Sequence, residues 1–220
     1  MHKVKGVLFD LDGVITDTAE LHYSAWEVAL QKKYNMQLPS KYNFLLRGVE
    51  RTTAAAIILK EELQILNHQE ILEFSSFKNQ IYRKSLSNLN KQDILPGISN
   101  FIDELVDNNI KISLASASIN APEILRHLEL IDKFSAIIDP TTVKKGKPAP
   151  DIFIKAAEAI NVPTDSCVGI EDSLVGIKAL KSAGITSVGV GIEDYISKAD
   201  FSVATTNKIN MALINKIKEV

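Results

Sequence analysis

Short, mostly apolar runs that alternate with amphipathic helical segments restrict the fold of this chain more than any other feature. The segments between the later runs have helical patterns, such as NFIDELVDN and DIFIKAAEAI. Strands alternating with helices of this length predict right-handed βαβ units and a parallel sheet with helices on both faces. The five runs are GVLF at 6–9, KISLA at 111–115, AIID at 136–139, CVGI at 167–170 and SVGV at 187–190.

The stretch at 20–90 interrupts this alternation. It contains no convincing strand and has the pattern of several amphipathic helices, and in the first of them Leu21, Ala25, Val28 and Ala29 share one stripe. Because the stretch lies between the first strand and the rest of the sheet, we predict an α/β protein with an inserted α-helical cap. The predicted division is a Rossmann-like parallel sheet core at 1–15 and 92–220, and a helical cap domain at 16–91.

Composition narrows the classes of function. The chain has 220 residues, of which 45% are hydrophobic, and this is enough for one domain with an insertion. Its net charge is −2 and it has no long basic run, so we expect no nucleic-acid partner. No apolar run reaches the roughly 18 residues of a membrane helix, and Asp10 and Asp12 interrupt the only early apolar stretch. We therefore expect a soluble cytoplasmic protein without a signal peptide, a monomer, with Cys167 as a reduced core residue.

Polar side chains follow four of the predicted strands. In an open parallel sheet, ligands bind beyond the carboxyl ends of the strands, so these side chains should meet at one rim. Carboxylates repel one another when they are close and ionised, which calls for a cation among them. We therefore predict a Mg²⁺ site for an anionic substrate. The residues at this rim are Asp10, Asp12, Ser116, Lys147, Glu171 and Asp172.

Each of these residues also has an ordinary structural interpretation. A lone aspartate after a strand is usually a turn residue or a helix cap, and Asp172 could simply begin the next helix. Lys147 could be a solvated loop lysine. However, Pro148 restricts its predecessor to extended backbone, and Pro150 suits the first turn of the next helix, so the backbone under Lys147 is fixed. Their coincidence on one rim favours a functional site.

Four stretches of the chain match a known pattern. DLDGVITDT, ASAS, KPAPDIF and GIEDS resemble the four motifs of the haloacid dehalogenase superfamily of phosphotransferases, and the insert is similar to that superfamily's small helical cap. The resemblance implies a hexose-phosphate mutase that uses Mg²⁺, acts on small sugar phosphates, and proceeds through an aspartyl-phosphate and a sugar bisphosphate. A phosphatase of the same superfamily is the alternative. A non-catalytic phospho-ligand binder is a third hypothesis, which the paired carboxylates at the first strand disfavour.

The resemblance also implies a role for each acidic residue at the rim. Asp10 would be the nucleophile that becomes phosphorylated, and Asp12 would be the general acid and base. The metal ligands would be Asp10, Glu171, Asp172 and the backbone carbonyl of Asp12.

Phosphate contacts are assigned in the same way. Ser116, the backbone N–H of Ala117 and Lys147 would hold the transferring phosphoryl group. The second phosphate would bind just before a helix expected to start near Pro122, because helix N-termini attract anions, although the polar residues there could equally be helix caps. The residues assigned to it are Ser118, Ile119 and Asn120.

The cap would supply the other half of the site. Gly48 and Val49 would approach the sugar by backbone, and Arg51 would clamp the non-transferring phosphate, with a surface charge as the alternative. Thr18 and His22 would couple cap closure to the placement of the general acid, although a helical histidine is more often a surface or partly buried residue. The remaining cap residues assigned to the substrate are Arg47 and Trp26, the latter with simple packing as its alternative.

Four residues depart from the family pattern. Relatives commonly have lysine at the positions of Arg47 and Ile119, and an acidic and hydroxyl pair at the position of Thr53 and Ala54. These changes leave the transfer chemistry intact and leave the identity of the sugar open.

Overall fold

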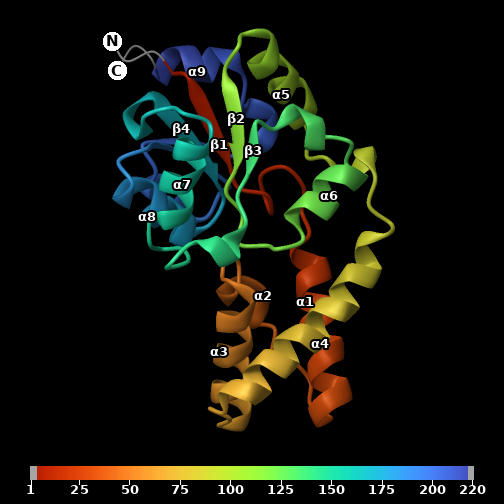
Figure 1. Cartoon of the computed structure of the whole chain (residues 1–220). Helices are drawn as coiled ribbons and strands as arrows, with labels where there is room; N and C mark the ends of the chain where they lie inside the picture. The colour runs from red at the N-terminus through yellow and green to blue at the C-terminus, as the bar shows by residue number, and fades with distance from the viewer. Residues whose placement is uncertain (1–3, 218–220) are drawn as a thin grey trace.

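The computed structural model describes residues 4–217 as an α/β core from which a bundle of helices projects (Figure 1). The core sheet has six parallel strands in the order β3-β2-β1-β4-β5-β6, so the predicted parallel sheet is confirmed. The five predicted runs form β1 to β5, whereas β6 was not predicted because a three-residue strand gives little pattern. The strands are β1 (Gly6–Phe9), β2 (Lys111–Leu114), β3 (Ala136–Ile137), β4 (Cys167–Glu171), β5 (Thr186–Val190) and β6 (Phe201–Val203).

Helices cover both faces of the sheet, as expected for a parallel sheet. Side chains of β1 alternate between two hydrophobic clusters: Val7 and Phe9 belong to the cluster with α5, α6 and α9, and Leu8 belongs to the cluster with α7 and α8. Cys167 is buried in the second cluster, which confirms it as a free core cysteine. The core helices are α5 (Ile98–Asp107), α6 (Ala121–His127), α7 (Asp151–Ala159), α8 (Leu174–Ser182) and α9 (Met211–Ile217).

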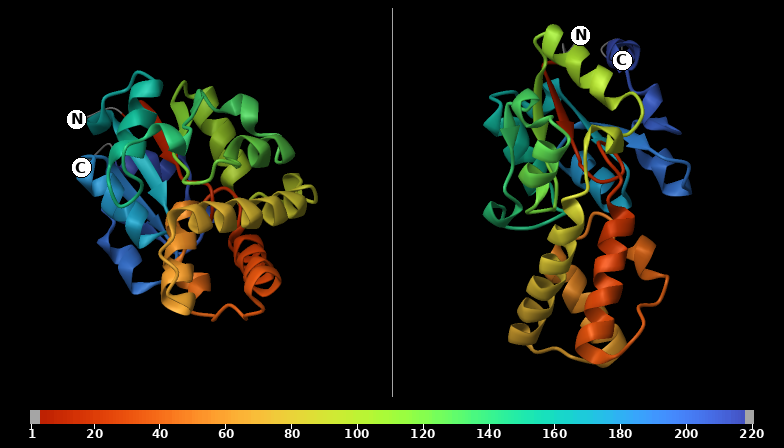
Figure 2. Two further views of the ribbon diagram at one scale, coloured as in Figure 1. Left: turned by 60° about the horizontal axis from the view of Figure 1, so that its bottom comes forward. Right: turned by 90° about the vertical axis from the view of Figure 1, so that its right-hand side faces the viewer.

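The inserted helices form a bundle with its own hydrophobic cluster, which Trp26, Leu30, Ile58 and Phe74 help to build. Figure 2 shows this bundle on one side of the core in both views. Within residues 4–217, no helix is long and apolar enough to cross a bilayer. The domain boundaries stay a prediction, and their ends at 1–3 and 218–220 lie outside the described residues. The bundle contains α1 (Ala19–Tyr34), α2 (Tyr42–Leu45), α3 (Arg51–Leu63) and α4 (His68–Leu86).

Two chain connections join the bundle to the core, and they are bonded to each other. The backbone N–H of Leu95 donates to the carbonyl of Ile15 at 2.8 Å, and the Thr16 hydroxyl donates to the carbonyl of Asp93 at 2.8 Å. The outgoing and returning segments therefore act as one base for the bundle.

The strand order reverses between β1 and β4, which lie side by side. The backbone N–H of Asp10 donates to the carbonyl of Ile170 at 3.0 Å, so Asp10 and Glu171 leave the sheet next to each other. A reversal point at the carboxyl ends of parallel strands is where open α/β sheets bind their ligands.

Candidate active site

A cleft of about 930 Å³, its open mouth included, lies between the carboxyl edge of the sheet and the helical bundle. Thr18, Lys147 and Glu171 lie behind its wall: Thr18 is bonded to Asp12, and Lys147 is bonded to both Asp10 and Glu171. The structure therefore brings together the residues singled out in the sequence. Those that line the cleft are Asp10, Asp12, His22, Trp26, Arg47, Gly48, Val49, Arg51, Ser116, Ala117, Ser118, Ile119, Asn120 and Asp172.

Lys147 is buried between two carboxylates. Its side chain is 1% exposed, and its Nζ donates to Asp10 Oδ1 at 2.7 Å and to Glu171 Oε1. The alternative of a solvated loop lysine is therefore wrong. Burial would lower the pKa of Lys147, but the two carboxylates outweigh burial and raise it. Burial raises the pKa of Asp10 to about 7, against the pull of Lys147 and with help from Glu171.

Glu171 is fixed by the start of α8. Its Oε2 accepts hydrogen bonds from the backbone N–H and the hydroxyl of Ser173, both at 2.9 Å. Ser173 also caps α8, since its Oγ accepts from the N–H of Gly176 at 3.1 Å. Asp172 therefore does not serve as the helix cap. A Cβ at position 176 would lie 1.8 Å from Glu171 Oε1, so only glycine leaves room for this carboxylate.

Three carboxylates of the rim could hold a metal ion. Asp10, Glu171 and Asp172 each offer an oxygen, and these oxygens lie within 4.8 Å of one another. Burial, followed by the charges of Glu171 and Asp10, raises the pKa of Asp172 well above its usual value. An all-oxygen set of crowded, buried carboxylates fits a hard divalent cation. The backbone at Gly13, whose φ is +74°, approaches Asp172 closely. A Cβ at Gly13 would lie 2.1 Å from Asp172 Oδ2.

Asp12 is oriented by a chain of hydroxyl groups from the bundle. The Tyr82 hydroxyl donates to Thr18 Oγ1 at 3.0 Å, and the Thr18 hydroxyl donates to Asp12 Oδ1. Burial raises the pKa of Asp12, although the Thr18 hydrogen bond opposes this. A carboxyl whose neutral form is favoured is suited to donate a proton to a leaving oxygen.

Lys78 was not singled out in the sequence, yet it lies in the cleft beside His22. Its side chain is 1% exposed, its Nζ lies 2.6 Å from His22 Nδ1, and it sits over the rings of Trp26 at 4.8 Å and Tyr82 at 4.6 Å. Burial lowers the pKa of Lys78 to about 7, with the charge of Asp12 opposing. Burial and Lys78 together lower the pKa of His22, so its ring is neutral.

The sequence does contain a signal for Lys78. It falls on the buried stripe of α4 that Ile71, Phe74 and Tyr82 also form, at spacings of three to four residues. A lysine on the apolar stripe of a helix is unusual, because lysine is almost never fully buried unless it has a partner. Asn79 follows it into the cleft and was also missed.

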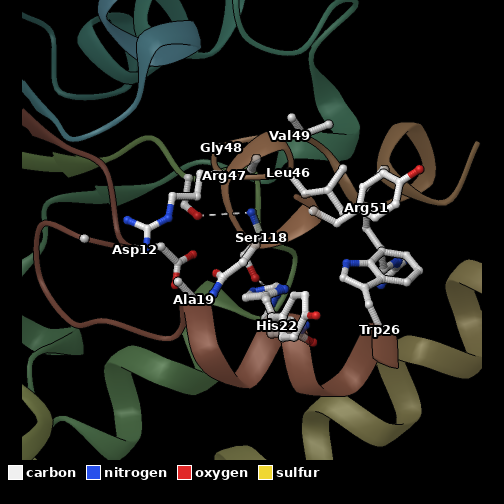
Figure 3. A pocket seen from close by; sticks show the side chains of 18 of the residues that line it. Asp12, Ala19, His22, Trp26, Leu46, Arg47, Gly48, Val49, Arg51 and Ser118 are labelled. Carbon is white, nitrogen blue, oxygen red and sulfur yellow. Dashed lines mark hydrogen bonds between the residues drawn. The ribbon is translucent and has the colours of Figure 1, made fainter. Parts of the chain in front are cut away.

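The bundle presents cationic groups to the cleft. Within residues 4–217, Arg51 Nε and Nη1 and Arg47 Nε are buried without a hydrogen-bond partner, so a plain surface charge at Arg51 is wrong. Arg47 Nη1 lies 3.9 Å from Asp172 Oδ2 on the core. Figure 3 shows Asp12 and Arg47 at one end of the cleft and Arg51 with Trp26 at the other. Trp26 also packs against Phe74, with ring centroids 5.4 Å apart, so it both lines the cleft and packs within the bundle, and its contact with substrate stays a prediction.

The bundle is closed onto the core. Gly48 has a φ of +70°, and a Cβ there would lie 2.8 Å from Ser173 Oγ and 3.1 Å from Val175 Cγ2. Glycine is therefore required both for the turn and for the contact between the two halves.

The loop after β2 is folded around its own side chains. Ser116 Oγ accepts from the N–H of Ser118 at 3.0 Å, and Ser118 Oγ accepts from the N–H of Asn120 at 3.3 Å. Asn120 precedes α6 without capping it by its side chain, and instead donates to Asn79 Oδ1 of the bundle at 2.8 Å. Ile119 is 42% exposed at the cleft.

Comparison with known proteins agrees with this geometry. A model of the haloacid dehalogenase-like hydrolase family matches residues 4–184. The chain is 43% identical over 216 residues to a β-phosphoglucomutase of Bacillus subtilis, covering 97% of this chain and 95% of the relative. It is 30% identical over 190 residues to a phosphorylated carbohydrates phosphatase of Thermotoga maritima, covering 84% of each. A crystal structure of β-phosphoglucomutase from Clostridium difficile is similar with a TM-score of 0.92 and 38% identity, over 97% and 96% of the two chains.

We expect Gly176→Ala to disrupt the acidic cluster. The added methyl group would overlap the Glu171 carboxylate, and overpacking of this kind costs about 1–3 kcal/mol. Urea unfolding should show this loss, and calorimetric titration with Mg²⁺ should show weaker binding. Gly146→Ala is the control, because its Cβ would meet nothing closer than 3.9 Å. Equal behaviour of the two variants would contradict the steric argument.

We expect Lys78→Met to stabilise the protein at pH 7, by about 1 kcal/mol or more, because a buried amine with a lowered pKa opposes folding. Between the folded pKa of about 7 and the unfolded value of 10.5, only the unfolded lysine holds its proton, so wild-type stability from this group rises with pH. The advantage of the variant should therefore shrink from pH 7 to pH 10 in urea unfolding. Lys84→Met, at an exposed lysine, is the control. A stability difference between Lys78→Met and the wild type that grows with pH would contradict the lowered pKa of Lys78.

Proposed function

The chain belongs to the haloacid dehalogenase-like hydrolase family, and we propose that it catalyses the β-phosphoglucomutase reaction. In this reaction β-D-glucose 1-phosphate and D-glucose 6-phosphate interconvert through β-D-glucose 1,6-bisphosphate. The similarity to β-phosphoglucomutases over nearly the full chain supports this choice of sugar phosphate.

A cleft with anion-binding groups at both ends is the observation that carries the proposal. At one end, Asp10 lies beside Lys147, whose Nζ is 2.7 Å from its carboxylate. At the other end, Arg51 holds buried nitrogen donors without partners. A sugar with a phosphate at each end supplies a partner for the Arg51 donors while its other phosphate lies at Asp10, and a guanidinium is suited to bidentate phosphate contact.

Transfer begins when an Asp10 carboxylate oxygen attacks the phosphorus atom at the core end. The bond between phosphorus and the sugar oxygen breaks, and Asp12 gives its proton to that oxygen. Lys147 and the backbone after Ser116 hold the phosphoryl oxygens during this step. In the reverse direction, Asp12 removes the proton from a sugar hydroxyl while its oxygen attacks the phosphate on Asp10.

The mutase requires the bisphosphate to turn round between two such transfers. Phosphorylated Asp10 first gives its phosphoryl group to the 6-oxygen of β-D-glucose 1-phosphate. After the bisphosphate has turned round, Asp10 takes the phosphoryl group from carbon 1, which leaves D-glucose 6-phosphate. Arg51 holds whichever phosphate is not reacting. Closure by Gly48 against Ser173 supports the exclusion of water, which would otherwise accept the phosphoryl group.

The acidic cluster is suited to Mg²⁺. Asp10, Glu171 and Asp172 would hold the ion, with the backbone carbonyl of Asp12 as a further ligand, and it would neutralise the charge between nucleophile and phosphate. Lys147, which is paired with Asp10 and Glu171, performs part of the same neutralisation.

One assay tests the proposed function. The protein is mixed with β-D-glucose 1-phosphate, Mg²⁺ and a trace of the 1,6-bisphosphate, and glucose 6-phosphate is measured against free phosphate. A large excess of glucose 6-phosphate supports the mutase. Stoichiometric release of free phosphate would instead show the phosphatase, the alternative that a 30% identical relative represents.

We expect Asp12→Ala to lower mutase turnover by about 10²–10⁴-fold through loss of proton transfer. Phosphorylation of Asp10 by acetyl phosphate should survive better, because acetate leaves without a proton. Intact-mass spectrometry measures the phosphoenzyme, and Asp10→Asn, which has no nucleophile, is the matched control that should lose both activities. Equal loss with both donors in Asp12→Ala would mean that Asp12 has a structural role.

We expect Arg51→Ala to lower kcat/KM of the mutase by about 30-fold to several thousand-fold, since losing one partner of a desolvated charge pair costs roughly 2–5 kcal/mol. Arg51→Lys should recover part of this, because an ammonium lacks the two-pronged geometry. Hydrolysis of a small phosphate ester that cannot reach the bundle should hardly change. The exposed Arg126→Ala is the control for loss of a charge. Parallel loss of both activities in Arg51→Ala would argue against the phosphate clamp.

A further inference from the structure

An aromatic contact crosses from the bundle to the core at the edge of the cleft. The rings of Phe44 in α2 and Tyr195 in the 3₁₀ turn at Asp194–Lys198 have centroids 5.9 Å apart and are tilted by 56°. Phe44 is 55% exposed, so it is not part of the interior of the bundle. Figure 1 shows α2 at the end of the bundle next to the core. An aromatic pair in this geometry favours the closed arrangement by about twofold to tenfold.

Tyr195 also reaches the acidic cluster. Its hydroxyl donates to the backbone carbonyl of Asp172 at 3.1 Å. Asp172 lies between Glu171, at the end of β4, and Ser173, the cap of α8. The bond from Tyr195 therefore fixes the backbone that carries the Asp172 carboxylate. Burial, with the nearby charges of Glu193 and Asp172, raises the pKa of Tyr195 to about 12, so the hydroxyl keeps its proton at neutral pH.

The stretch of the bundle that contains Phe44 makes a second contact, directly with Asp172. Arg47, three residues after Phe44, approaches the Asp172 carboxylate at 3.9 Å. One short segment thus contacts Asp172 directly through a guanidinium and indirectly through the Tyr195 ring. Opening of the bundle would break both contacts at once. Tyr195, which bonds the Asp172 peptide, would then lose the support of the Phe44 ring.

We propose that Tyr195 is a positioning residue that couples closure of the helical bundle, through Phe44, to the orientation of Asp172 in the metal cluster. The inference rests on the proposed function for its consequence, namely that closure of the cleft strengthens metal binding at the cluster. Because coupling between two sites is reciprocal, a cation on the cluster also favours closure.

Three variants test the coupling. Tyr195→Phe removes only the hydroxyl, Phe44→Ala removes only the ring on the bundle, and the third variant carries both changes. Tyr34→Phe is the control for a lost hydroxyl, because its hydroxyl donates to Glu70 within the bundle at 2.8 Å. Leu66→Ala is the control for a lost apolar side chain, since Leu66 is 70% exposed.

Calorimetric titration with Mg²⁺ alone gives the first measurement. We expect Tyr195→Phe to weaken binding by about threefold to tenfold, the value of one hydrogen bond, while both controls match the wild type. Phe44→Ala should weaken binding in the wild-type background and have a smaller effect in the Tyr195→Phe background. Wild-type affinity in Tyr195→Phe, or effects of the two changes that simply multiply, would overturn the proposal.

Hydrogen exchange gives a measurement that needs neither metal nor substrate. Amides at 172–176 should exchange faster in Tyr195→Phe and in Phe44→Ala than in either control. If the wild type fails the mutase assay, the proposed function fails, and these exchange rates still decide the coupling. Unchanged rates in both variants would overturn the coupling even in an active mutase.

Discussion

The buried ion pairs of Lys147 with Asp10 and Glu171 are the interaction on which the rest of the site depends. They join β1, β4 and the loop before α7 at the carboxyl edge of the sheet. Breaking a buried pair by removing one partner leaves an uncompensated charge and typically costs 3–5 kcal/mol. The lysine therefore permits two carboxylates to stand side by side at the reversal of the strand order.

Charge is divided between the two halves of the molecule. The core rim carries the carboxylates, and the bundle carries Arg47, Arg51 and Lys78 toward the same cleft. Each half is unfavourable alone, because like charges repel and buried amines lose their hydration. An anionic sugar phosphate, with a cation on the core side, makes the two halves complementary, so the substrate class follows from this division.

Much of the fold could be predicted because its signals are local. The apolar runs of β1 to β5 and the stripe that contains Ala25 and Ala29 follow directly from burial. By contrast, β6 has three residues, and the contact of Phe44 with Tyr195 joins positions 151 apart along the chain, so neither leaves a local pattern.

The rim residues could be predicted because strand ends of a parallel sheet must meet. The bundle side could not be placed without the resemblance, since Arg51 alone looks like a surface charge. Lys78 was not predicted, because it lies in none of the motifs and only its place on the apolar stripe of α4 marks it. Its partner His22 was found through the motif, and their 2.6 Å approach depends on how α1 and α4 pack.

Among the described residues, several polar groups of the closed cleft are buried without hydrogen-bond partners, and this opposes closure. Within residues 4–217, Asn43 Oδ1, Arg47 Nε, and two of the three side-chain nitrogens of Arg51, Nε and Nη1, are buried without a partner in the protein. A buried polar group left unsatisfied costs about 1–3 kcal/mol, so these groups oppose the aromatic pair and the long Arg47 contact that hold the bundle shut. Water satisfies these groups when the bundle opens, and a phosphate satisfies the arginines when it is closed. A ligand that reaches the bundle therefore stabilises the closed arrangement further, which ties the exclusion of water to the presence of the second phosphate.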